Sequence, residues 1–208
     1  MRAGMTRVAA FDLDGTVTDR DCVVPFLRKV AGTWTIVAGL AAHPVRVGGA
    51  LARRDRDAVK AAAARAAFRN RRVETIEPIA ARFAADVHRD WIRPAAAEHI
   101  AGHRDAGDAI VIVSASFELY VEPLGSLLGV DGVLATRLVT DAGRFTGDLD
   151  GPNCRGPEKV QRLHAWLDQH HGGRAAVELV AYGDSPGDRE LLADADIAHW
   201  VDATWGGR

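Results

Sequence analysis

Residues 11–18 read FDLDGTVT and place two carboxylates, Asp12 and Asp14, where an apolar run ends. Gly15 lets the chain turn sharply directly after them. A pair so placed can hold a hard cation and still leave one carboxylate to attack phosphorus and the other to move a proton. The stretch therefore predicts aspartyl-phosphate chemistry, although Asp and Gly are also the commonest residues of ordinary turns.

Apolar runs that end in polar residues recur along the chain. Residues 8–11, 109–113 and 177–182 are apolar apart from Glu178. The first two runs are followed directly by Asp12 and Ser114, and the third by Gly183 and Asp184. Helical patterns lie between them, at about 117–129 and 157–170. This alternation predicts an α/β fold with a Rossmann-like, doubly wound parallel sheet that carries its chemistry at the carboxyl ends of the strands.

Two shorter elements are predicted in addition. Residues 138–149 read as a small antiparallel β-hairpin, with Gly143 in its turn, and this hairpin is expected to be a side feature of the sheet. Residues 197–201 read as a last strand. A short helix is expected from Gly187 onward, with Leu191 and Leu192 facing inward.

A helical insertion is predicted between the first and second apolar runs. Residues 20–93 are rich in Ala and Arg, have helical spacing and lack a strand pattern, and Pro94 marks the return to the core. Two apolar helix faces are predicted within them, one of Val59, Ala62, Ala63, Ala66 and Ala67 and one of Val73, Ile76, Ile79, Ala80, Phe83 and Val87. The sequence thus predicts a catalytic core of residues 1–19 and 94–208 with a helical cap of residues 20–93. A cap excludes water and contacts whatever the phosphate is attached to.

Three further motifs follow in the order that phosphoryl transfer through an aspartate requires. They are VIVS at 111–114, GPEK at 156–159 and YGDSPGD at 182–188. With all four motifs in order over essentially the whole chain, the sequence resembles the haloacid dehalogenase (HAD) superfamily. Within it, the resemblance is to subfamily IB, the phosphoserine-phosphatase-like hydrolases, and it implies a phosphatase with its cap between the first two motifs.

The first motif is expected to supply the reacting groups. Asp12 is the expected nucleophile, and Asp14 protonates the leaving oxygen and later takes a proton from water. Asp14 also separates this chain from the dehalogenase branch, for which the resemblance implies no acid at that position. Mg²⁺ is the expected cofactor, held by a carboxylate oxygen of Asp12, the backbone carbonyl of Asp14 and Asp184. Thr16 is expected either to orient Asp14 or to cap the following helix.

The later motifs are expected to hold the phosphate. Its contacts would be the Ser114 hydroxyl, the backbone amides of Ala115 and Ser116, and the Lys159 ammonium. Asp188 is expected to bind a metal-bound water or to hold Lys159, and it can also cap the helix that follows.

Asp21 is the candidate for substrate specificity. It aligns with the place where phosphoserine phosphatases carry an acidic residue that reads the amino group of the substrate, and it equally suits the N-cap of a helix over residues 23–30. Candidate cations of the cap stand on Ala-rich helices, where charged residues are mostly solvated. They are Arg53, Arg54, Arg65, Arg69 and Arg71.

Composition narrows the expected partners and location. The 208 residues suffice for one α/β core with an insertion, and the formal net charge of −2 offers no basic field for nucleic acid. Cys22 and Cys154 lack metal-type spacing and are expected as free thiols of a reducing compartment. No signal-peptide pattern is present, and the charge-free run 30–45 is too short to span a membrane. We expect a cytoplasmic monomer or homodimer that acts on a small phosphate ester, without nucleic acid and without stable membrane insertion.

The substrate stays open at this level. Phosphoserine phosphatases carry, by the resemblance, an Asn in place of Gly187 and two Gly in place of Ala115-Ser116, which weakens phosphoserine. The stretch DGTVTDRD at 14–21 also resembles a branch that includes bacterial phosphatidylglycerophosphatases, so a lipid phosphate is an alternative. A second alternative function is a phosphotransferase that uses the same aspartyl-phosphate intermediate. A third is a non-catalytic binding protein, and the intact acidic motifs argue against it.

Overall fold

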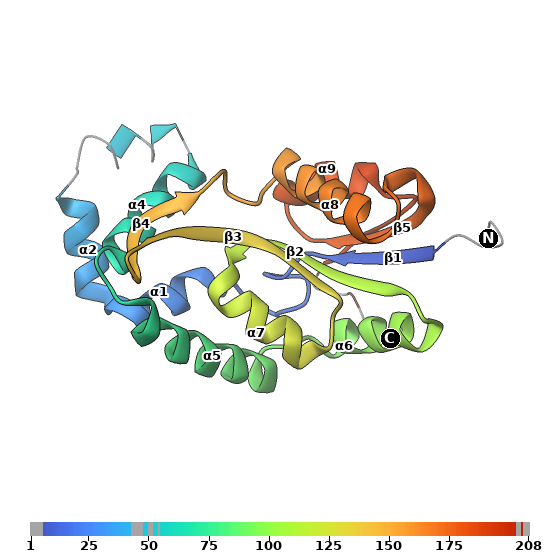
Figure 1. Ribbon diagram of the computed structural model, residues 1–208, viewed down its shortest axis with the longest axis horizontal. Coiled ribbons are helices and arrows are strands. Elements are labelled where there is room, and N and C mark those ends of the chain that lie inside the picture. The colour runs from blue at the N-terminus through green and yellow to red at the C-terminus, as the bar shows by residue number, and fades with distance from the viewer. Residues whose placement is uncertain (1–5, 43–47, 50–51, 54, 203–204, 206–208) are drawn as a thin grey trace.

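The computed structural model describes residues 6–42, 48–49, 52–53, 55–202 and 205. Within these residues six strands form one sheet in the order β4-β3-β2-β1-β5-β6 (Figure 1). The strands are β1 (Thr6–Phe11), β2 (Ala109–Phe117), β3 (Gly132–Asp141), β4 (Arg144–Asp150), β5 (Val177–Gly183) and β6 (Ile197–Trp200). Neighbouring strands pair in parallel except β3 and β4, which are antiparallel.

Helices cover both faces of this sheet (Figure 1). They are α6 (Pro94–Ala106), α7 (Glu118–Leu128), α8 (Pro157–His170) and α9 (Arg189–Asp194), with short 3₁₀ turns at Arg174–Ala176 and Pro186–Asp188. In β1, Ala9 and Phe11 pack with α6 and α7, while Val8 and Ala10 pack with α8 and α9. Successive side chains of a strand point to opposite faces, so a strand covered on both sides is apolar throughout. The predicted Rossmann-like, doubly wound α/β fold is confirmed.

The β3–β4 hairpin is larger than the sequence predicts. β3 begins at Gly132 rather than near residue 138, because its first half pairs in parallel with β2 and only its second half pairs with β4. The hairpin is therefore the edge of the main sheet, and its interpretation as a side feature was wrong. Its turn contains Ala142 and Gly143, both with positive φ, and such a turn favours Gly.

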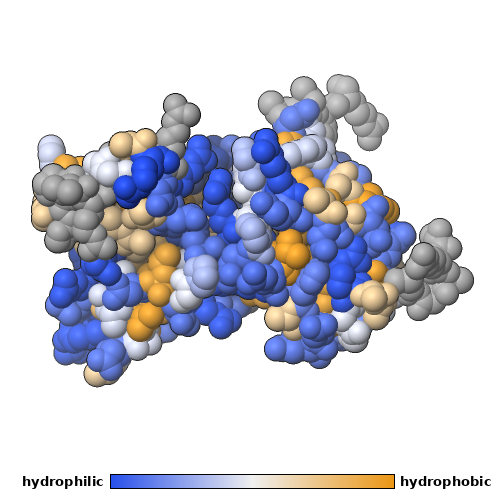
Figure 2. Space-filling model, turned by 90° about the horizontal axis from the view of Figure 1, so that it is seen from above, coloured by the Kyte–Doolittle hydropathy of each residue, from blue (hydrophilic) through white to orange (hydrophobic). Residues whose placement is uncertain are grey.

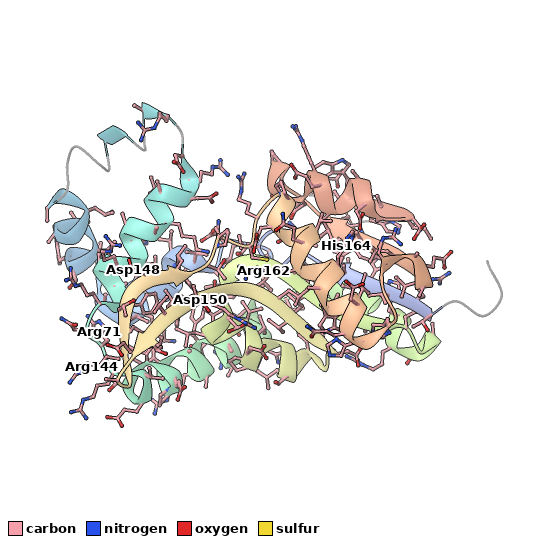
Figure 3. All side chains as sticks on the ribbon, turned by 45° about the horizontal axis from the view of Figure 1, so that its top comes forward. Arg71, Arg144, Asp148, Asp150, Arg162 and His164 are labelled. Atoms are coloured by element: carbon pink, nitrogen blue, oxygen red, sulfur yellow. The ribbon has the colours of Figure 1, made fainter. Side chains whose placement is uncertain are left out.

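Residues 20–93 are called the helical insertion below, and their described part lies at one end of the molecule beside the hairpin (Figure 1). Their helices are α1 (Val23–Ala31), α2 (Thr33–Ala41), α4 (Arg56–Phe68) and α5 (Val73–Asp90). α4 packs against β4, and α5 packs along α7. Arg65 forms an ion pair with Asp148 of β4, and Arg144 Nη1 donates to the Asn70 carbonyl at 2.7 Å. Figure 3 shows Asp148 on β4 and Arg144 near the turn of the hairpin.

The insertion packs through the apolar helix faces that the sequence predicts. Each predicted position is buried or half-buried: Val59, Ala62, Ala63, Ala66 and Ala67 in α4, and Val73, Ile76, Ile79, Ala80, Phe83 and Val87 in α5. These helices also bury the predicted free thiol Cys22 together with Phe26 and Phe83, and Cys154 is likewise free and buried.

No single helix of the described residues combines the length and the apolar composition that crossing a membrane requires. Helices α1 and α2 meet both criteria only when taken together, and they are bent by 97° at the break between them. On the face over α4, α8 and α9 the surface is mostly hydrophilic, with separate hydrophobic patches (Figure 2).

Candidate active site

The carboxyl end of β1 places Asp12 at the centre of the candidate site. The Asp12 N–H donates to the Tyr182 carbonyl at 2.9 Å, which extends the parallel pairing of β1 with β5 by one residue. The carboxylate is buried, and Lys159 Nζ donates to its Oδ1 at 2.5 Å. Burial raises the pKa of Asp12 to about 7, against the opposing charge of Lys159.

Lys159 joins the first motif to the last. It lies in the first turn of α8, is buried, and its Nζ also donates to Asp188 Oδ1 at 2.6 Å. Burial alone would lower the pKa of Lys159, but the charges of Asp12 and Asp188 outweigh it and the pKa is raised. The ammonium is therefore held as a charged group between two carboxylates.

Asp188 holds Lys159, one of the two roles expected for it. Its second oxygen accepts from the Ser185 N–H at 3.0 Å and from the Ser185 hydroxyl at 2.7 Å, while the Ser185 hydroxyl accepts from the Gly187 N–H at 3.2 Å. This reciprocal capping box folds the turn Pro186–Asp188 and fixes the direction of the Asp188 side chain.

Three carboxylates form a cluster that fits a hard cation. One oxygen each of Asp12, Asp184 and Asp188 lies within 4.8 Å of the others, and oxygen donors of this kind suit Mg²⁺. Gly15, with φ of 87°, contributes space as well as a turn, because a Cβ at this position would overlap the Asp184 carboxylate. Burial raises the pKa of Asp184, and the charge of Asp188 adds to this effect.

Among the residues that the structure describes, the Thr16 side chain contacts Asp184 and not Asp14. Its hydroxyl donates to Asp184 Oδ1 at 3.4 Å, so it positions a candidate metal ligand rather than Asp14 or a helix terminus. This contact could not be predicted from the sequence, because Thr16 and Asp184 come together only through the pairing of β1 with β5.

Asp14 is held by two donors from outside its own motif. Its Oδ1 accepts from the Cys22 N–H at 2.7 Å, and its Oδ2 accepts from the Ser116 hydroxyl, which in turn accepts from the Tyr120 hydroxyl at 2.6 Å. Burial, together with the charge of Asp21, raises the pKa of Asp14 to about 6. Such a carboxyl can exchange a proton near neutral pH.

The loop after β2 differs in part from the expected phosphate contact. Ser114 is buried, and its hydroxyl accepts from the Ser116 N–H at 3.0 Å, so that amide already has a partner. Ala115 lines the cavity beside Asp12 and Lys159, whereas Ser114 does not. The geometry therefore favours Ala115 over Ser116 as the source of a backbone contact to phosphate.

The cavity above these residues has a volume of about 770 Å³ and lies between the core and the helical insertion. Asp21 lines it and also accepts from the Val24 N–H at 3.1 Å, so both interpretations of Asp21 have a structural basis. The cations that the insertion brings to the wall are Arg56 and Lys60. The described candidates Arg53, Arg65, Arg69 and Arg71 do not line it, and Arg54 lies outside the described residues.

Lys60 is the residue that sequence analysis missed. Its Nζ donates to Asn153 Oδ1 at 2.6 Å, to the Thr136 hydroxyl at 3.0 Å and to the Ala115 carbonyl, and it lies 4.6 Å from the centre of the Phe117 ring. It thereby ties α4 to the loop after β2. Helical spacing could have indicated this role. Ala64 and Ala67 follow Lys60 by four and seven residues and are fully buried, so Lys60 lies on the same, inward face of the helix.

Comparison with known proteins identifies the family of this chain. Over residues 9–193 the chain matches the family of haloacid dehalogenase-like hydrolases. Protein CicA of Caulobacter vibrioides is 39% identical over 190 residues, which cover 91% of this chain and 83% of CicA. A phosphoserine phosphatase of a Polaromonas species is 25% identical over 198 residues, which cover 92% of this chain and 77% of that enzyme.

The fold is also found among solved structures. A phospho-aspartyl intermediate analogue of phosphoserine phosphatase superimposes with a TM-score of 0.62 at 20% identity, covering 92% of this chain and 84% of the other. The chain therefore belongs to the haloacid dehalogenase-like hydrolase family. It is a phosphatase with the phosphoserine-phosphatase-like fold.

Proposed function

We propose that this phosphatase hydrolyses a small phosphomonoester with Mg²⁺, through an aspartyl-phosphate on Asp12. The observation that carries the proposal is the buried contact between Asp12 and Lys159 at the carboxyl end of β1, beside Asp184 and Asp188. A cation fixed at this point offsets the charge of the phosphate, so an anionic nucleophile can approach an anionic ester.

The reaction would proceed in two steps. In the first, an Asp12 carboxylate oxygen bonds to phosphorus while the bond to the leaving oxygen breaks, and Asp14 gives that oxygen its proton. In the second, Asp14 takes a proton from water as the water attacks phosphorus, and Asp12 is released with inorganic phosphate. The donors on Cys22 and Ser116 keep the Asp14 carboxyl oriented in both steps.

The carboxylates of Asp12 and Asp184 and the backbone carbonyl of Asp14 would hold Mg²⁺, which when bound draws charge from the phosphate oxygens. Asp188 accepts hydrogen bonds from Lys159 and from the Ser185 hydroxyl, and so would hold Lys159 in place. Ala115 and Lys159 would contact the phosphate, with Ser114 shaping the loop that presents Ala115.

The division of the chain follows from the same proposal. Residues 1–19 and 94–208 would form the catalytic core, and the helical insertion would act as the cap. Supporting this, the cavity combines core residues such as Asp12 and Lys159 with insertion residues such as Leu27 and Lys60. The groups that contact the phosphate come from the core, so the insertion would decide which alcohol is accepted.

One observation favours a lipid phosphate as a second candidate substrate. The cavity wall has an apolar part, formed by Val23, Val24, Leu27, Val59 and Ala63. Release of phosphate from phosphatidylglycerophosphate in mixed micelles, compared with release from phosphoserine, would decide between the two classes. Cytoplasmic location and a monomeric or homodimeric state stay predictions.

Asp12→Asn tests the proposed function. The variant keeps the shape of the side chain but lacks the nucleophile, so turnover of p-nitrophenyl phosphate in Mg²⁺ should fall at least about a thousandfold, as for loss of other covalent nucleophiles. Asp105→Asn, on the exposed surface of α6, is the matched control and should keep wild-type turnover. Comparable activity of the Asp12 variant, with an unchanged circular dichroism spectrum, would overturn the mechanism.

A further inference from the structure

Arg155 places an unpartnered guanidinium in the wall of the active-site cavity. The residue precedes the GPEK motif, is half-buried, and lines the same cavity as Asp12 and Lys159. Within the part of the chain that the structure describes, its side chain makes no hydrogen bond, ion pair or ring contact. None of the four motifs includes Arg155, and the two-step mechanism above does not use it.

Gly187 provides the space in which this side chain lies. A Cβ at position 187 would stand 2.9 Å from Arg155 Nε and 3.1 Å from Arg155 Cγ. The backbone of Gly187 is not in the positive-φ region, so the conformation itself does not require glycine. The absence of a side chain at Gly187 therefore allows Arg155 to approach the backbone of the last motif closely.

The backbone that carries Arg155 is held on several sides. The Gly156 N–H donates to the Gly187 carbonyl at 2.9 Å, which joins this segment to the last motif. Arg162 Nη2 donates to the Pro152 carbonyl at 2.8 Å, and Asn153 Oδ1 accepts from Lys60. Figure 3 shows Arg162 on α8, close to β3. The backbone segment from which the guanidinium projects is thus fixed before any ligand binds, which lowers the cost of ordering the side chain on a ligand.

We propose that Arg155 binds a second anionic group of the substrate, a carboxylate or a phosphate on the part of the molecule that is not transferred. This rests on the proposed phosphatase function. A guanidinium presents paired donors that match either anion, and a partly desolvated one gains most from such a partner. Its neighbour Lys159 is already bonded to Asp12 and Asp188, so the two cations have separate tasks.

Matched pairs of esters test the proposal. O-phosphoserine and O-phosphoethanolamine differ by one carboxylate, and 1,4-butanediol bisphosphate and butyl phosphate differ by one phosphate. Inhibition constants of all four are measured against p-nitrophenyl phosphate hydrolysis. For the wild type we expect the member with the second anion to bind roughly ten- to a hundredfold more tightly in one of the pairs, the range for a charge-assisted hydrogen bond. The pair that shows the preference identifies the anion.

Two variants should abolish this preference by different routes. Arg155→Met removes the charge, and Gly187→Ala keeps the charge but displaces the side chain. In both, the ratio of the two inhibition constants should approach one, while Arg155→Lys should keep part of the preference. Arg189→Met, on the exposed surface of α9, is the control and should keep the wild-type ratio.

The outcomes separate the two proposals. Equal inhibition constants within both pairs for the wild type, or a ratio that survives in Arg155→Met, would overturn the role of Arg155 and leave the phosphatase mechanism standing. Equal weakening of all four esters in Arg155→Met would also overturn it, because the guanidinium would then contact the transferred phosphate. Failure of the proposed function would instead appear as wild-type protein without p-nitrophenyl phosphate hydrolysis.

Discussion

Replacing Lys60 with Met tests the contact by which the helical insertion reaches the core. Burial lowers the pKa of Lys60 from 10.5 to about 8, and the charge of Arg162 adds to this effect. Asp14, Cys154 and Asp57 oppose it without cancelling it. In the unfolded chain the same ammonium has the ordinary pKa of a lysine. Met has a similar length and no charge, so it removes this difference between the two states.

The pH dependence of stability follows from these two pKa values. Below about pH 8 the folded and unfolded states both hold the Lys60 proton, and between about 8 and 10.5 only the unfolded state holds it. The free energy of unfolding therefore rises with pH across this window. The gap between 10.5 and about 8 corresponds to about 3 kcal/mol, which we reduce to ~2 kcal/mol because the side chain is not fully shielded from water.

Urea unfolding followed by circular dichroism, from about pH 7 to 10.5, measures this difference. The wild type should gain ~2 kcal/mol relative to Lys60→Met across the window, and other lysines and tyrosines cancel to first order in the comparison. Lys29→Met is the control, because Lys29 pairs with Asp86 at the surface. Parallel stability curves for the wild type and Lys60→Met would refute the reasoning, since they would show that the Lys60 ammonium is solvated in the folded protein.

Two further predictions concern the metal and Asp21. Phosphatase activity should disappear in a chelator, return with Mg²⁺ and be inhibited by Ca²⁺, which prefers more ligands and looser geometry than Mg²⁺; undiminished turnover in the chelator would contradict the proposed cofactor. Asp21→Ala should cost roughly 1 kcal/mol of stability through loss of its bond to the Val24 N–H. Because Asp21 also lines the cavity, the same change should raise the KM for phosphoethanolamine more than that for ethyl phosphate. Uniform loss on both esters, beside a lowered melting temperature, would leave Asp21 with the capping role alone.

Local sequence was enough to predict the fold class and the centre of the candidate site. Apolar runs that end in polar residues are a local signal, and parallel strands bring their carboxyl ends to one edge of a sheet. Asp12, Asp184 and Asp188 follow β1 and β5 and could therefore be expected to meet. Lys159 lies in the first turn of α8, and only the resemblance to the HAD superfamily predicted its place beside Asp12. The apolar faces of α4 and α5 could also be predicted from local sequence, because the helical period of 3.6 residues is visible within a single helix.

Only the tertiary structure decided which side chains reach the site from outside the motifs. Lys60 meets Asn153 across 93 residues, and Thr16 meets Asp184 across 168. The first half of β3 likewise forms through its parallel pairing with β2, and the identity of that partner strand cannot be read from residues 132–137 alone. The long side chain of Arg155 lies against Gly187, which has no side chain to exclude it. Such contacts depend on how whole elements pack, and close packing couples residues whose neighbours in sequence carry no information about each other.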